Sequence, residues 1–154
     1  MKGFFPCRSC RVCKEAQTIR TNKFHSTVTG KEYPIRNFIS CHTKGVVYLL
    51  QCECNYQYVG RTIRTAAIRI GEHLTNIHKA FPGHSVSQHF AQCHRKNPKR
   101  LKIIVIEKYT PHWRGSNLRR SISRRETFWI YELGCSRPRG LNIEWDINAH
   151  INNC

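Results

Sequence analysis

The sequence predicts a small α/β domain in which a three-stranded, mostly antiparallel sheet is flanked by helices. Three short segments, at 45–51, 57–61 and 101–106, are rich in β-branched and other apolar residues, which favour strands. Two longer segments, at 65–79 and 116–133, repeat apolar residues three and four positions apart, which is typical of amphipathic helices. Together these segments give one sheet with helices packed against it.

The first two strands are expected to form a hairpin. The segment 45–51 reads GVVYLLQ and the segment 57–61 reads QYVGR, with a short polar break at 52–56 between them. A break of this length returns the second strand beside the first, so the two strands should pair in antiparallel fashion.

The segment 65–79 is predicted to be a helix that begins at Thr65, whose hydroxyl can cap the first turn. Its apolar positions, spaced three and four apart, are Ala67, Ile70, Leu74 and Ile77. Pro82 and Gly83 then break the chain, and a short helix is expected at 85–94.

The second long helix carries a carboxylate inside its apolar stripe. The stripe is formed by Leu118, Ile122, Trp129 and Leu133. Glu126 falls within it, and Gly134 is placed to end the helix. Because a buried carboxylate without a partner is costly, Glu126 should either pair with an arginine such as Arg125 or bind a hard cation such as Mg²⁺.

The chain is expected to divide near residue 41. Residues 1–40 lack clear periodicity and contain Cys7, Cys10 and Cys13 in the pattern C-x-x-C-x-x-C, so we interpret them as a zinc-stapled, DNA-binding module. Residues 41–154 hold the predicted sheet and helices. A length of 154 residues suits one compact domain with a small appended module.

The charge of the chain points to a polyanionic partner. There are 26 Lys and Arg against 9 Asp and Glu, a formal net charge of +17. Self-repulsion of this size destabilises a compact fold, and nucleic acid is the commonest compensating polyanion. A ribosomal-type or membrane-surface protein has a similar balance. Insertion into a membrane is not expected, because no apolar run approaches the roughly 20 residues that a spanning helix needs, and the first residues do not resemble a secretory signal.

The nine cysteines favour bound metal over disulfides, because several are tightly spaced and no secretory signal is expected. Cys52 and Cys54 form a C-x-C pair in the break of the hairpin. Close pairs often ligate tetrahedral zinc, since one turn presents two sulfurs to one ion. Thiols that bind metal indicate an intracellular, reducing compartment.

Arg69 and His73 are four positions apart in the first long helix, so they share the face beside its apolar stripe. At the margin of the core they could bind a phosphate group and a water molecule. The same pair is equally compatible with a solvated basic face, so the spacing alone leaves both interpretations open.

The order of these features resembles the GIY-YIG nuclease family. That family has a strand with the tripeptide Gly-Ile-Tyr, a second strand with Tyr-Ile-Gly, an Arg-x-x-x-His helix, a later Glu and a downstream Asn. The matching residues here are Val46, Val47, Tyr48, Tyr58, Val59, Gly60, Arg69, His73, Glu126 and Asn142. Val46 departs from the pattern, because the family has glycine at that structural position. The resemblance covers residues 45–143 and implies a small GIY-YIG-type fold.

A closer resemblance is to the endonuclease domain of Penelope-like retroelements, which has two cysteines between the strands and two histidines downstream. The corresponding residues are Cys52, Cys54, His89 and His94. Two zinc-binding side chains from the hairpin and two from the short helix would tie these elements together around one structural Zn²⁺ ion. The adjacent Cys93 is a rival to His94.

The C-x-x-C-x-x-C cluster also resembles that group, and we expect it to bind a second Zn²⁺ ion. The proposed ligands are Cys7, Cys10, Cys13 and Cys41. His25 and His42 are alternatives for the fourth position.

The resemblance implies a metal-dependent endonuclease that hydrolyses a phosphodiester by in-line attack of water. Glu126 would bind one Mg²⁺ or Mn²⁺ ion, and Arg69 would neutralise the scissile phosphate. Tyr48 or Tyr58 would accept the proton of the water, which requires a pKa below the ordinary value of about 10.

His73 would orient water or relay protons, and Asn142 would hydrogen-bond to Glu126 or to the substrate. The retroelement setting implies that the protein nicks target DNA in the nucleus, so that a reverse transcriptase can prime from the new 3′ end. That enzyme would lie on another part of a longer chain or on another protein.

Further basic residues are expected to contact backbone phosphates without reading sequence. The candidates are Arg61, Lys96, Lys99, Arg100, Arg119 and Arg120. Two other functions stay open, namely a catalytically inactive, zinc-stabilised nucleic-acid-binding module and a structure-specific repair nuclease of the same fold. The complete catalytic set favours the enzyme over the module, and the cysteines of the hairpin break argue against the repair nuclease.

Overall fold

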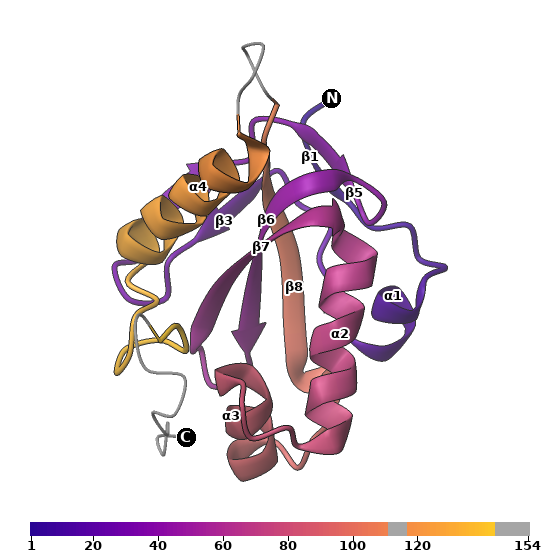
Figure 1. Ribbon diagram of the computed structural model, residues 1–154, viewed down its shortest axis with the longest axis vertical. Helices are drawn as coiled ribbons and strands as arrows, with labels where there is room; N and C mark the ends of the chain where they lie inside the picture. The colour runs from indigo at the N-terminus through magenta and orange to yellow at the C-terminus, as the bar shows by residue number, and fades with distance from the viewer. Residues whose placement is uncertain (111–116, 144–154) are drawn as a thin grey trace.

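The structure is a computed structural model in which residues 1–110 and 117–143 are described. The elements are β1 (Gly3–Phe5), α1 (Arg11–Glu15), β2 (Gln17–Thr18), β3 (Lys23–His25), β4 (Glu32–Pro34), β5 (Phe38–Ser40), β6 (Lys44–Cys52), β7 (Gln57–Thr65), α2 (Ala66–Lys79), α3 (Ser85–Cys93), the 3₁₀ turn η1 (Pro98–Arg100), β8 (Leu101–Lys108) and α4 (Leu118–Leu133). Figure 1 shows α2 and α4 flanking the central strands, with α3 beyond one end of them.

The main sheet has four strands in the order β2-β8-β6-β7. β6 is antiparallel to both β7 and β8, as expected for the three predicted strands, and β2 adds to the edge of β8 in parallel. The prediction of three strands was therefore one too few. β2 contributes two residues from a region without periodicity, and β1-β5 and β3-β4 form two further small sheets. Segments of two or three residues are too short to show alternation.

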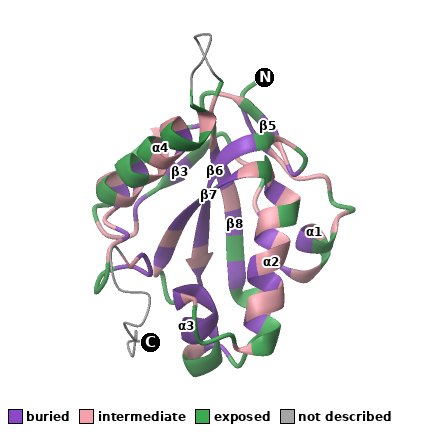
Figure 2. Ribbon diagram, viewed as in Figure 1, coloured by how far each residue is buried: buried purple, intermediate pink, exposed green. Residues whose placement is uncertain are grey.

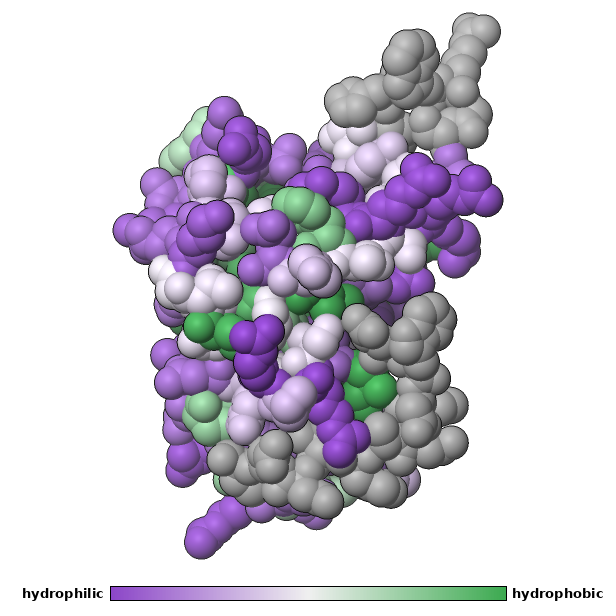
Figure 3. Space-filling view, turned by 90° about the vertical axis from the view of Figure 1, so that its left-hand side faces the viewer, coloured by the Kyte–Doolittle hydropathy of each residue, from purple (hydrophilic) through white to green (hydrophobic). Residues whose placement is uncertain are grey.

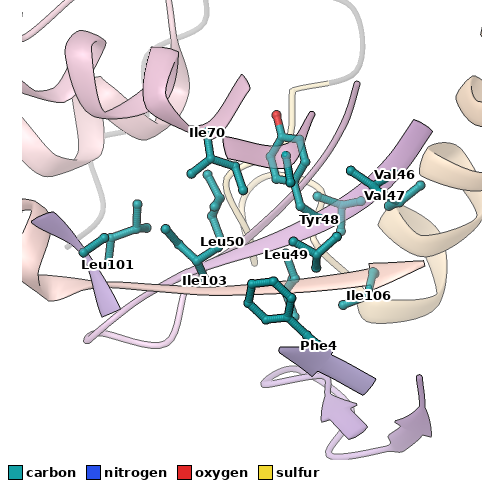
Figure 4. Packing of buried hydrophobic residues seen from close by; sticks show 14 of the residues in the cluster. Phe4, Val46, Val47, Tyr48, Leu49, Leu50, Ile70, Leu101, Ile103 and Ile106 are labelled. Carbon is teal, nitrogen blue, oxygen red and sulfur yellow. The ribbon is translucent and has the colours of Figure 1, made fainter. Parts of the chain in front are cut away.

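The central strand β6 is buried on both faces. Successive side chains of a strand point to opposite sides, so Tyr48 and Leu50 lie on the side of Ile70 from α2, while Leu49 lies on the side of Phe4 (Figure 4). All five of these residues are at most 1% exposed. The apolar run at 45–51 thus reflects two covered faces.

The helix predicted at 65–79 is confirmed by α2. The hydroxyl of Thr65 accepts a hydrogen bond from the backbone N–H of Ile68 at 3.2 Å, which caps the first turn. Ile70, Leu74 and Ile77 are buried, and the helix shows a buried stripe on the side of the sheet (Figure 2).

The second long helix is α4, which begins at Leu118 after Asn117 caps it. The predicted start at 116 lies outside the described residues. Gly134 ends the helix in the left-handed conformation with φ of 65°, as predicted. The expected third helix is α3, which ends at Cys93, so His94 caps it from outside.

The first 40 residues pack into the same core as the rest of the described chain. Phe4, Val12 and Ile39 belong to one hydrophobic cluster with the strands of the main sheet. The domain boundary near residue 41 stays a prediction. Across the described ranges, every helix is too short or too polar to cross a membrane.

Gly60 on β7 faces Tyr48 across the hairpin, and the two residues are register partners. A Cβ atom at position 60 would overlap the phenol ring of Tyr48. The missing side chain therefore lets the Tyr48 ring cross β7 and reach α2.

Replacing Gly60 by alanine is expected to lower the free energy of unfolding by about 1–3 kcal/mol, because the buried Tyr48 ring must move. Gly71→Ala is the matched control. A Cβ atom there meets nothing within 4 Å, and the helix gains propensity, so that variant should be neutral or stabilised by up to about 1 kcal/mol. Urea unfolding of both variants tests the clash; equal stabilities would contradict it.

Candidate active site and metal centres

A cavity of about 430 Å³ lies where β6, β7, α2 and α4 meet. The side chains lining it are mostly basic or aromatic, and they include Tyr48, Tyr58, Arg61, Arg64, Arg69, Arg119 and Glu126. Six of these positions were predicted from the sequence as catalytic or DNA-binding. Only Arg64 was missed, because it lies beyond the predicted end of the second strand at residue 61, whereas β7 continues to Thr65.

His73 lies beneath this cavity and is 1% exposed. The hydroxyl of Tyr48 is 2.7 Å from its Nε2 atom, and its Nδ1 atom has no hydrogen-bond partner among the described residues. Burial, with added repulsion from His84 and Arg69, holds the pKa of His73 well below its ordinary value. A neutral imidazole can therefore accept a hydrogen bond from the Tyr48 hydroxyl.

His84 belongs to the same cluster, and it was not predicted. Its ring lies 4.7 Å from that of His73 between centroids, and its Nε2 atom is 3.4 Å from the Tyr58 hydroxyl. Its Nδ1 atom accepts a hydrogen bond from the N–H of Val86, so His84 also caps α3. Histidine is an uncommon helix cap, so this role could not be predicted from the residue type.

Both tyrosines are held as neutral phenols. Burial raises the pKa of Tyr48 well above 10 and that of Tyr58 to about 12, and the nearby Arg69 opposes these shifts without cancelling them. A tyrosine that acts as the base was expected to have a pKa below its ordinary value. In the protein alone, the pKa values of Tyr48 and Tyr58 are raised instead. The partner of Tyr48 is neutral His73, which can accept a hydrogen bond from the phenol at 2.7 Å.

Glu126 points from α4 into the cavity, and its side chain is 15% exposed. Its partner is Arg61 on β7, with an Nη1–Oε1 distance of 2.5 Å. Burial raises the pKa of Glu126, and the charge of Arg61 opposes that shift. The alternative partner Arg125 instead forms a bidentate pair with Glu107 at 2.6 and 2.8 Å. One position along a helix turns a side chain by about 100°, which directs Arg125 elsewhere.

Two of the arginines share one carboxylate at the rim. Glu72 is 2.8 Å from Arg64 and 3.1 Å from Arg69. Arg69 and His73 lie on one face of α2 as predicted, with the arginine 26% exposed and the histidine buried. The interpretation of this pair as a wholly solvated basic face is therefore wrong.

Asn142 does not contact Glu126. Its Oδ1 atom accepts from the N–H of Val59 at 2.8 Å, and its Nδ2 atom donates to the carbonyl of the same residue at 2.9 Å. Both ends of the amide are thus used to fasten the chain beside β7. The hydrogen bond expected between Asn142 and Glu126 is therefore replaced by a structural one to the backbone of β7.

Cys52, Cys54, His89 and His94 form the first of two groups that could hold zinc, with ligand atoms all within 4.8 Å of one another. The Cys54 sulfur is 3.0 Å from Nε2 of His89 and 3.3 Å from Nε2 of His94. Ligands of one tetrahedral zinc ion lie roughly 3.3–3.8 Å apart, given the usual bond lengths. The residues fit Zn²⁺, and His94 rather than Cys93 is the fourth member.

The second such group consists of Cys7, Cys10, Cys13 and Cys41. The sulfurs of Cys13 and Cys41 are 3.6 Å apart, and those of Cys7 and Cys13 are 4.0 Å apart. Cys41 is therefore the fourth member in place of the alternatives His25 and His42. Backbone N–H groups of Ser9 and Cys10 point at the Cys7 sulfur and lower its pKa to about 5, which favours the thiolate that binds zinc.

The other predicted DNA-binding residues do not all lie at the cavity. Arg119 lines it, and Arg120 follows on the exposed first turn of α4. Figure 3 shows hydrophilic residues over much of the side of the molecule that lies on the left in Figure 1. Lys96, Lys99 and Arg100 lie around η1, before β8, and Arg100 is paired with Glu53 at 2.7 Å. Leu118 and Tyr109, the residue after β8, both lie beside Gly45, so the start of α4 is near the end of β8. The eight-residue strand, roughly 26 Å long, therefore separates the two groups of basic residues. Contact of either group with DNA stays a prediction.

Acid is expected to destabilise the fold through His84, which is half-buried. Burial lowers the pKa of His84 from 6.5 to about 4. Between these two values the unfolded chain takes up a proton that the folded chain refuses, so the free energy of unfolding falls as the pH falls from 6.5 to about 4.

The matched variant is His84→Asn, because asparagine keeps the cap of α3 and does not titrate. Chemical unfolding at several pH values between 7 and 4 should show a smaller loss of stability for the variant than for the wild type. Identical pH profiles would mean that His84 titrates normally in the folded protein.

Comparison with protein-family models, with curated proteins and with solved structures found no match for this chain.

Proposed function

We propose that the chain is a metal-dependent DNA endonuclease of GIY-YIG type, which nicks target DNA for insertion of a retroelement. The observation that carries this proposal is the cavity that gathers four arginines, two tyrosines and Glu126 around buried His73. Its chemistry suits a phosphodiester, because guanidinium groups match phosphate oxygens and do not lose their charge. Action with a reverse transcriptase, in the nucleus, belongs to the same proposal.

The position of the Glu126 carboxylate in the cavity favours an enzyme over a module that only binds nucleic acid. Glu126 is the only carboxylate among the described residues that line the cavity. In a site that only binds phosphate, a partly buried carboxylate would repel the ligand. A carboxylate among arginines is explained if a divalent cation lies between it and a phosphate oxygen.

Glu126 fits one Mg²⁺ or Mn²⁺ ion, since Mg²⁺ binds proteins through one or two carboxylates and keeps several waters. When bound, the ion would polarise a phosphate oxygen and stabilise the leaving oxygen. Arg69 would neutralise the scissile phosphate from the rim of the cavity.

Proton transfer in this proposal uses Tyr48 and His73. Neutral His73 takes the phenol proton through the 2.7 Å hydrogen bond, while Tyr48 takes one proton from the attacking water. The water oxygen bonds to phosphorus and the bond to the 3′ oxygen breaks. The 3′ oxygen leaves as an alkoxide and takes a proton from solvent, and His73 returns its extra proton to solvent. Tyr58 lacks such an acceptor, because its hydroxyl is 3.4 Å from His84, whose Nδ1 atom already caps α3.

The alternative is a zinc-stabilised nucleic-acid-binding module without catalysis. It is favoured by the net charge of +17 and by the two groups that could hold zinc. It requires DNA binding but no cleavage with any divalent cation.

The experiment is single-turnover cleavage of labelled duplex DNA with Mg²⁺ or Mn²⁺, comparing Arg69→Ala with the wild type. The variant is expected to be slower by roughly 10²–10³-fold, the usual effect of removing one transition-state donor. Arg20→Ala is the matched control, because it removes the same charge from an exposed residue that stacks on Phe5. If wild-type protein binds the duplex and leaves it intact with every cation, the binding module is the better account.

A further inference from the structure

The Arg61–Glu126 pair stands at the centre of a longer groove. A second cavity of about 540 Å³ is lined by the N-terminal end of α3, by the later part of α4 and by the segment of Asn142. It shares Tyr58, Arg61 and Glu126 with the first cavity. The ion pair therefore lies where the two cavities meet, between the β7 wall and the α4 wall.

The two partners differ in how they are held. Glu126 sits on a helix and its side chain is 15% exposed, whereas the side chain of Arg61 is 45% exposed. Arg61 is long and can turn toward solvent without a cavity being left behind. Glu126 is the more buried of the two side chains. When the pair opens, Arg61 is the partner that moves.

In the Arg61–Glu126 pair, the arginine is hydrogen-bonded to the same carboxylate that would bind the proposed cation. Among the described lining residues of either cavity, Glu126 is the only acid, and a guanidinium on its Oε1 atom occupies one of the two oxygens. Arg64 and Arg69 are paired with Glu72 instead. The cation must therefore compete with Arg61 for the carboxylate of Glu126. No other described arginine is hydrogen-bonded to that carboxylate.

A phosphate group would reverse this competition. Arginine binds phosphate oxygens as well as it binds a carboxylate, and it does so with two parallel hydrogen bonds. A phosphodiester lying along the groove would come between Arg61 and Glu126, drawing the guanidinium to its own oxygens. The freed carboxylate and the phosphate would then face one another, an arrangement that only a cation stabilises.

On the basis of the proposed function, we infer that Arg61 is a positioning residue that keeps Glu126 from the divalent cation until a substrate phosphate takes up its guanidinium. Cation and DNA then bind cooperatively, and the coupling acts equally in both directions. In the absence of DNA the protein binds the cation weakly, which keeps the site inactive until the substrate is in place.

The test measures Mn²⁺ binding to the zinc-loaded full chain without DNA, by the loss of the free-ion electron paramagnetic resonance signal. The Mn²⁺ binding that is present in the wild type and lost in Glu126→Gln is assigned to the proposed cation site. Arg61→Gln is expected to bind Mn²⁺ more tightly than the wild type by about 10-fold, within the usual range of coupling between sites. The same zinc-loaded variant should bind DNA more weakly without added Mn²⁺ or Mg²⁺, since it has lost a phosphate contact.

Arg64→Gln is the matched control, because it removes the same charge from the same cavity but its partner is Glu72. If Arg61 acts through Glu126, Arg64→Gln changes the Mn²⁺ affinity by less than about 2-fold. This inference is overturned if the Mn²⁺ affinity rises equally in both variants, or rises in neither, while the wild type still cleaves DNA. The proposed nuclease function would then still stand. The absence of any Glu126-dependent Mn²⁺ site, together with no cleavage, overturns the inference and the proposed function together.

Discussion

Replacement of Glu126 by glutamine is expected to slow DNA cleavage by roughly 10³-fold or more, because the cavity loses its only described carboxylate and with it the proposed cation. The amide has nearly the same shape, so packing against β7 is kept. DNA affinity should be unchanged or higher, since Arg61 loses its ionic partner and is available for phosphate.

The measurement is the single-turnover cleavage rate at saturating protein, with DNA affinity and zinc content determined on the same preparations. Glu132→Gln is the matched control. It changes the same group on the same helix, but its carboxylate accepts a hydrogen bond from Tyr33 at 2.9 Å, away from the cavity. Equal rates for the two variants would show that Glu126 has no special part in the reaction.

Loss of the zinc group in the hairpin break is the second large effect that we expect. Replacing Cys54 by serine should remove one equivalent of zinc and lower the free energy of unfolding by several kcal/mol. Cys54 is exposed, so the substitution itself removes no core packing. Stability falls because α3 has only nine residues, and its buried face includes Ser85, Ser87 and His89, which offer little hydrophobic stabilisation.

Zinc content by mass spectrometry and urea unfolding test this expectation together. His42→Ala is the matched control, because His42 is an exposed potential ligand that lies outside both groups. It should keep the zinc content and the stability of the wild type. If Cys54→Ser retains as much zinc as the wild type, the group of Cys52, Cys54, His89 and His94 is not a metal site.

The parts of the fold that were predictable are those with local signals. Thr65 caps α2, Gly134 ends α4, and the strands β6, β7 and β8 contain apolar runs long enough to recognise. β2 was not predictable, because two residues carry no period and its pairing with β8 joins positions 85 apart, such as Gln17 and Lys102.

The candidate site divides in the same way. Arg69 and His73 share a helical face, and spacing alone brings them together. The partner of Glu126 depends on the packing of α4 against β7. The sequence therefore suggested an arginine such as the adjacent Arg125 and did not single out the distant Arg61. His84 joins the site only because α3 begins beside Tyr58.

The most direct test of the central claim is the conversion of supercoiled plasmid to open circle by the wild-type chain with Mg²⁺ or Mn²⁺. The account predicts that wild-type protein nicks the plasmid, that the zinc-loaded protein does not nick it when Mg²⁺ and Mn²⁺ are left out, and that Glu126→Gln binds the plasmid without nicking it. Both proteins should contain equal zinc. If the wild type binds the plasmid and no divalent cation supports nicking, the cavity is not a nuclease site, and the chain is better described as a zinc-stabilised DNA-binding module.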